Sequence, residues 1–131
     1  MQMRSFLLLI SCAAMAASAA SAHHSHAIFD NDTWRELEGT VQQVLWVFPH
    51  TWIYAEIEDE QGQVELVALE ASNPNQIREA GVEEEHLQPG DRISVRCHPP
   101  RTGSTSGCLL GFVTPMHGDT ARGHGVERAW N

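Results

Sequence analysis

The sequence predicts a mainly β protein built as one small barrel of five strands with a short helix. Three observations lead to this prediction. Apolar and polar residues alternate with a period of two over most of the chain after residue 36, which is typical of half-buried strands. The alternation breaks once for a short helical segment, and it slips by one residue inside the first strand.

The first three strands follow one another directly. Leu37, Gly39 and Val41 alternate with polar residues, and the alternation resumes out of phase after Gln42-Gln43 and runs to Phe48. A slip of this kind predicts a β-bulge. Two further strands are expected around the turn Asp59-Glu60-Gln61-Gly62, from Trp52 to Glu58 and from Val64 to Ala68.

A helix and two strands complete the predicted barrel. Residues 72–81 combine residues that favour a helix N-cap with an early proline and a final glycine, which predicts a short helix. Alternation returns at Ile93-Val95-Cys97, and an apolar strand is expected from Cys108 to Thr114. A bulged first strand and a helix between strands three and four are typical of the OB-fold. We therefore expect an OB-like barrel over 37–114 and a flexible tail over 115–131.

The first 22 residues have the three parts of a secretory signal peptide. Arg4 supplies the positive charge, an apolar run begins at Phe6, and Ala20-Ser21-Ala22 fits a cleavage site. Cleavage would leave a His-rich leader, 23–36, and place the protein in the periplasm or the medium. Leu9-Ile10-Ser11-Cys12 also resembles a lipobox, so lipidation of Cys12 is the competing interpretation.

The composition argues against two classes of partner. The formal net charge is −9 at pH 7, and the chain contains no lysine, so binding to the phosphates of a nucleic acid is not expected. No apolar stretch after residue 22 approaches the roughly 20 residues that span a bilayer. No catalytic motif is recognisable, and we expect a protein that is not an enzyme.

Several segments together resemble a family of small exported bacterial proteins, domain of unknown function family 6152. The segments that carry the resemblance are His23–Asp30, Leu37–Val41, Pro49–Ile53, Ser72–Gln76, Leu87–Asp91 and His98–Gly103. The resemblance implies export and a small β-rich fold, and it supplies no activity. The chain departs from the family pattern in two places. Phe48 stands where the pattern has an asparagine, and Cys97 and Cys108 are peculiar to this chain.

Cys97 and Cys108 are the only cysteines after the signal peptide. An even number of cysteines in an exported chain favours a disulfide, here one that joins the fourth and fifth strands. A pair of free thiols and a pair of soft metal ligands are the alternatives.

Five histidines are the candidate metal ligands: His23, His24, His26, His50 and His98. Cleavage after Ala22 would add the α-amino group of His23, and amine and imidazole nitrogens suit copper or zinc. His50 and His98 flank prolines at strand ends and are expected on one rim of the barrel, where the leader can reach them. His86, His117 and His124 lie in polar contexts and are not counted as ligands.

Trp52 and Tyr54 share the outward face of the second strand and are candidates for stacking against a ligand. The leader, which includes Trp34, is the expected cover if they only pack. Two functions therefore stay open. One is binding of a divalent transition metal by the histidines, and the other is an envelope module that recognises a peptide, glycan or protein through its β surface.

Overall fold

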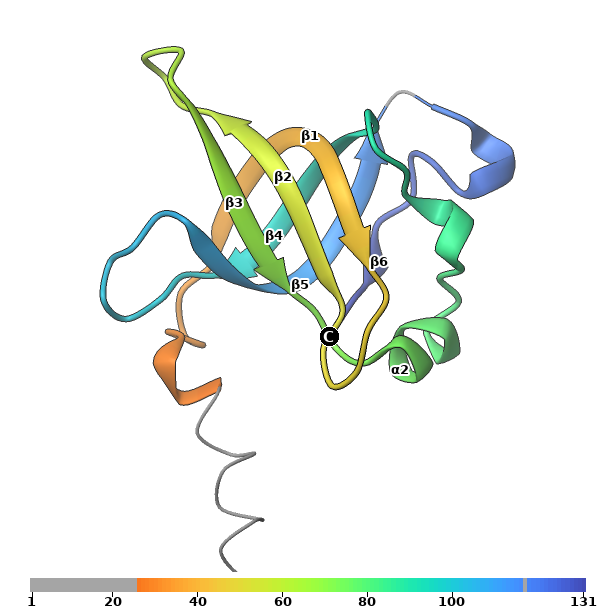
Figure 1. The fold of residues 1–131 in the computed structure, drawn as a ribbon, viewed down its shortest axis with the longest axis horizontal. Helices are drawn as coiled ribbons and strands as arrows, with labels where there is room; N and C mark the ends of the chain where they lie inside the picture. The colour runs from red at the N-terminus through yellow and green to blue at the C-terminus, as the bar shows by residue number, and fades with distance from the viewer. Residues whose placement is uncertain (1–25, 117) are drawn as a thin grey trace, which may run out of the picture.

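The protein is described by a computed structural model that covers residues 26–116 and 118–131. A closed barrel of five strands forms its centre (Figure 1). The strands are β1 (Arg35–Leu45), β2 (Trp52–Glu58), β3 (Val64–Glu70), β4 (Arg92–His98) and β5 (Gly107–Met116). Short 3-10 turns lie at His26–Ile28 (η1), Glu84–His86 (η2) and Thr120–Arg122 (η3).

The strand order is β3-β2-β1-β4-β5, and a parallel pairing of β3 with β5 closes the barrel. All other neighbouring strands in the barrel are antiparallel. The only α-helix among the described residues, α2 (Pro74–Glu79), lies between β3 and β4. The predicted OB-like barrel and the place of its helix are therefore confirmed.

The expected bulge is present in β1. Its register against β2 shifts between Val41 and Gln43, so one residue is left without a partner and the strand bends. Leu37, Gly39 and Val41 face the interior as predicted. The strand ends at Leu45, earlier than the Phe48 expected from the alternation.

Asn73 starts the helix, because its side chain accepts hydrogen bonds from the backbone N–H groups of Asn75 (3.0 Å) and Gln76 (3.1 Å). Pro74 occupies the first turn, where a missing N–H costs nothing. The helix packs Ile77 into a core that comes mostly from the strands, with Ala71, Val82, Leu87 and Trp130 added from outside them. The fully buried residues that the strands contribute to this core include Val41, Ile53, Val67, Leu69, Ile93 and Leu110.

The prediction of a flexible tail over 115–131 is wrong for the end of this segment. Strand β5 itself continues to Met116. Arg128–Ala129 form β6, which pairs with β5 at Phe112 and Val113. Trp130 is fully buried, and its ring lies 5.5 Å from that of Trp46. Because a buried indole removes a large apolar area from water, this one side chain anchors the C-terminal segment.

Candidate metal site

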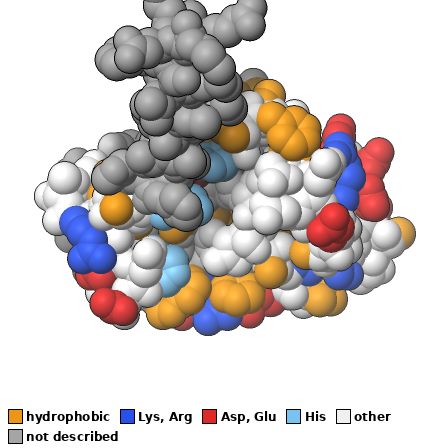
Figure 2. Space-filling view, turned by 90° about the horizontal axis from the view of Figure 1, so that it is seen from below, with side chains coloured by type: hydrophobic (Ala, Val, Ile, Leu, Met, Phe, Trp, Pro, Cys, Tyr) orange, Lys and Arg blue, Asp and Glu red, His pale blue; other side chains and the backbone are white. Residues whose placement is uncertain are grey.

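Three segments that are far apart in the sequence meet at one end of the barrel. They are η1, the β1–β2 connection and the end of β3, and Figure 1 shows all three at the lower end of the view. Figure 2, seen from that end, shows histidine side chains on this face. The site is built from the residues that these segments contribute.

His50 lies in the β1–β2 connection, after a cis peptide bond between Phe48 and Pro49. The next residue, Thr51, is fully buried, and its backbone N–H donates to Ser72 O (3.0 Å) while its carbonyl accepts from Ala71 N–H (2.9 Å). These bonds extend the β2–β3 pairing beyond the strand ends. His50 is therefore held beside the end of β3, with its side chain about a quarter exposed.

Glu70 is the last residue of β3, and its side chain is only 8% exposed. Its carboxylate contacts His50 Nδ1. A buried carboxylate is costly unless a positive charge, a hydrogen-bond donor or a metal ion compensates it. The His50 ring supplies such a donor to the Glu70 carboxylate.

His26 opens the described chain in η1. Two backbone hydrogen bonds dock this segment onto the β4–β5 connection, from Asp30 N–H to Pro99 O and from Arg101 N–H to Ile28 O (both 2.8 Å). The predicted leader is therefore attached to the barrel from residue 26 onward. Docking brings the His26 ring to 5.7 Å from the His50 ring, measured between centroids.

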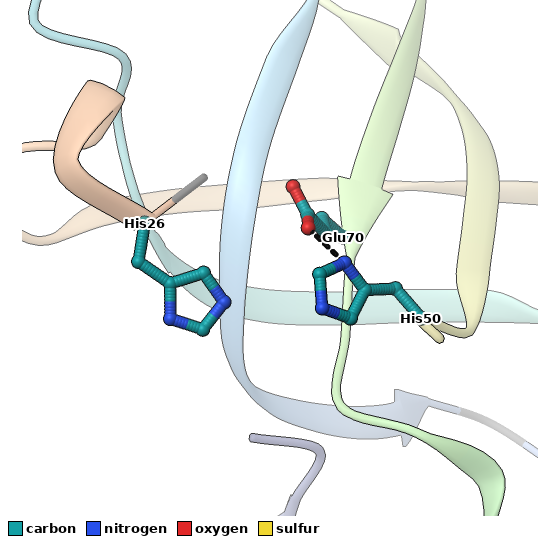
Figure 3. Close-up of side chains that lie close together, drawn as sticks. All are labelled: His26, His50 and Glu70. Atoms are coloured by element: carbon teal, nitrogen blue, oxygen red, sulfur yellow. Dashed lines mark ion pairs between the residues drawn. The ribbon is translucent and has the colours of Figure 1, made fainter. Parts of the chain in front are cut away.

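His26, His50 and Glu70 each offer one donor atom, and these atoms lie within 4.8 Å of one another. In Figure 3 the His26 ring points toward the His50–Glu70 pair. Two imidazoles and a carboxylate form a donor set that binds zinc, and imidazole also suits copper.

His98 is not part of this three-residue cluster. Glu70 on β3 and His98 on β4 both pair with Leu109 of β5, one on each side, so two strand spacings, roughly 10 Å, separate their backbones. His98 instead borders a cavity of about 440 Å³ that also reaches His26. Its Nδ1 lies 2.8 Å from Thr33 O, and its ring lies 3.9 Å from the Trp34 ring.

The predictions for the remaining site residues have different outcomes. His23 and His24 lie outside the described residues, as do the cleavage site and Cys12. The Cys97–Cys108 disulfide is confirmed, with 5.7 Å between the Cα atoms. Trp52 and Tyr54 are half-buried on β2. The leader was expected to cover these two side chains, but the Trp34 ring of the leader packs over His98 and Phe112 instead.

Two histidines that the sequence analysis set aside have structural roles. His86 and His124 are both buried, and His124 Nε2 donates to His86 O (3.0 Å). Burial lowers the pKa of His86, and Arg128 and Arg122 nearby lower it further, against a backbone hydrogen bond to Arg122 that raises it. These histidines pack the C-terminal loop against the barrel, away from the candidate site.

Glu70 is the site residue that the sequence analysis missed. Alternation places it outward like Ala68, so its burial is not visible from the pattern alone. The hairpin register carries the missing signal. When residues of the two strands are paired outward from the Asp59–Gly62 turn, Glu70 falls opposite Trp52, which lies two residues after His50.

The sequence matches the family of unknown function DUF6152 over residues 10–109. The chain belongs to this family. His26, His50, Glu70 and His98 all lie within the matched range. Neither the curated proteins nor the solved structures contain a significant match to this DUF6152 protein. None of the helices in residues 26–116 and 118–131 is long and apolar enough to cross a membrane.

Proposed function

We propose that this DUF6152 protein is exported and binds a divalent transition metal ion, copper or zinc, without acting as an enzyme. The observation that carries the proposal is the cluster of His26, His50 and Glu70, whose donor atoms lie within 4.8 Å of one another. Export is supported by the signal-like first 22 residues and by the disulfide, because disulfides persist in oxidising compartments.

The burial of Glu70 favours a metal site over an ordinary surface ion pair. A carboxylate that is 8% exposed loses most of its hydration, and a neighbouring histidine that is itself about a quarter exposed compensates this only partly. A divalent ion compensates it fully, and its binding releases any proton shared by His50 and Glu70. Metal affinity should therefore rise between about pH 5 and 8.

Calorimetric titration of the exported, tag-free protein with Zn²⁺ and Cu²⁺ tests the proposal. We expect one ion per chain, and we expect His50→Gln and Glu70→Gln each to weaken binding at least tenfold. The matched control is Glu65→Gln, which removes an equal charge from an exposed position on the same strand. Binding that is absent, or equal in all three variants, would contradict the proposal.

The leader is tested separately. If the α-amino group and imidazole of His23 join the site, a glycine added before His23 should weaken copper binding, and so should His23→Gln or His24→Gln. The intact mass of the exported protein gives the N-terminus and shows whether Cys12 carries lipid. A chain that begins at lipidated Cys12 would exclude the amine as a ligand.

A second function is favoured by a different surface. Trp52 and Tyr54 remain partly exposed on the outer face of β2, and Phe48 in the adjoining connection is 65% exposed. An aromatic surface of this kind suits stacking against a sugar or a peptide ring. Titration with glycan and peptide panels, followed by tryptophan fluorescence, would identify such a ligand, and Trp52→Ala should abolish its binding.

A further inference from the structure

Among the described residues, the proposed metal site has fewer donors than a closed site needs. Structural zinc sites are closed by four protein ligands, whereas sites with three keep a position open to water or to another ligand. Within the part of the chain that the structure describes, no fourth histidine, cysteine or carboxylate belongs to the cluster. An ion held by His26, His50 and Glu70 therefore keeps at least one position for a ligand from outside.

A cavity borders the proposed site at His26. It has a volume of about 440 Å³, which fits a small molecule, and His26 forms part of its wall. Asn31 and Ser72 supply polar groups to the wall, and Leu109 supplies an apolar surface. Asn131 also lines the cavity.

His98 is the residue of this cavity with the most constrained geometry. Thr33 O can only accept a hydrogen bond, so His98 Nδ1, at 2.8 Å, must carry the hydrogen. In the neutral ring this leaves Nε2 with a lone pair, and no described group donates to it. The Trp34 ring, 3.9 Å from the His98 ring, holds the imidazole in place.

We infer that the metal site takes a small protic ligand through this cavity, and that His98 Nε2 positions it by accepting a hydrogen bond. The ligand coordinates the ion with a lone pair and presents an N–H or O–H group to His98. Water satisfies both requirements, as does a small hydroxamic acid. The inference rests on the proposed metal site, and His98 acts here as a positioning residue and not as a metal ligand.

Two probes that differ in one hydrogen-bond donor test this geometry. Acetohydroxamic acid carries an N–H group, and N-methylacetohydroxamic acid has the same two oxygens without it. Protein and variants are loaded with one equivalent of Cu²⁺, loading is measured, and each probe is titrated by the visible copper absorption. The variant is His98→Asn, whose amide nitrogen can still donate to Thr33 O but which lacks a group at the place of Nε2.

We expect both probes to bind the loaded wild-type protein, and acetohydroxamic acid to bind about tenfold more weakly to His98→Asn. The affinity of the N-methyl probe should stay the same. If the N-methyl probe instead binds more tightly to His98→Asn, His98 acts only through its size. If acetohydroxamic acid binds wild type and variant equally well, the role of Nε2 is overturned. Loaded protein that shows no spectral response to either probe would overturn the open position, whereas failure to load copper would count against the metal site itself.

Discussion

The Cys97–Cys108 disulfide joins β4 to β5 at the edge of the candidate site, and its removal should destabilise the whole barrel. Both cysteines are buried, and their sequence separation is 11. Cross-linking restricts the unfolded chain, and for a loop of this length the chain-entropy relation gives about 2.8 kcal/mol. Because a small domain has roughly 5–15 kcal/mol of stability, this is a large share.

The perturbation is the double variant Cys97→Ala/Cys108→Ala, measured by urea unfolding at pH 7. We expect the free energy of unfolding to fall by about 2.8 kcal/mol and the melting temperature by about 12 °C. Unreduced and reduced wild-type protein, unfolded under the same conditions, provide the control, since reduction should reproduce most of the loss. A loss below about 1 kcal/mol, or two free thiols per exported chain, would refute the reasoning.

Three further perturbations test other parts of the fold. Trp130→Ala removes a fully buried indole and should lower the free energy of unfolding, measured in urea, by about 3–5 kcal/mol. A loss near zero would mean that Trp130 does not anchor the C-terminal segment. Gly39→Ala would place a Cβ 2.3 Å from Glu56 O, so it should destabilise strongly, whereas Gly107→Ala, with its nearest neighbour at 3.9 Å, should change the unfolding midpoint little. Because burial lowers the pKa of His86 from 6.5, the unfolded chain takes up this proton first, and stability should decline as pH falls below about 6.5. Replacing His86→Gln should reduce that decline between pH 7.5 and 5.5, and an unchanged slope would contradict the role of burial.

Most of the barrel was predictable because its strands have one face inside and one outside. Residues such as Ile53, Ala55 and Ile57 are buried at alternate positions, and this is the pattern that the sequence displays. The bulge in β1 was predictable for the same reason, since an extra residue shifts the phase of the alternation. Strand β6 was not, because two residues are too few to show a period.

The tail was misjudged because its composition conceals its anchor. Glycine and polar residues dominate 115–131, and a single buried Trp130 near the end contributes little to an average over the segment. The same applies to His86 and His124, which are buried by contact with each other's loops and not by any local pattern. Long-range packing of this kind has no signature within a short window of sequence.

The candidate site was predictable only in part. His26 was identified as part of the His-rich leader, and His50 was identified because histidines beside strand ends are free to bind a ligand. His98 was expected in the same cluster, and the strand spacing keeps it on the far side of Leu109. Glu70 required the hairpin register, which follows from the turn between β2 and β3 once that turn is placed.

The closure of the barrel explains why these residues lie together. The parallel pairing of β3 with β5 places Cys108 opposite Leu69 and Leu109 opposite Glu70, while β4 places His98 opposite Leu109 on the other side. The disulfide, the buried carboxylate and the positioning histidine therefore share one seam. His50 and Glu70 belong to the β2–β3 side of this seam, whereas the segment of His26 is docked on the β4–β5 connection. Because a metal ion that needs all three residues binds only when the seam is closed, metal binding and barrel closure should favour each other.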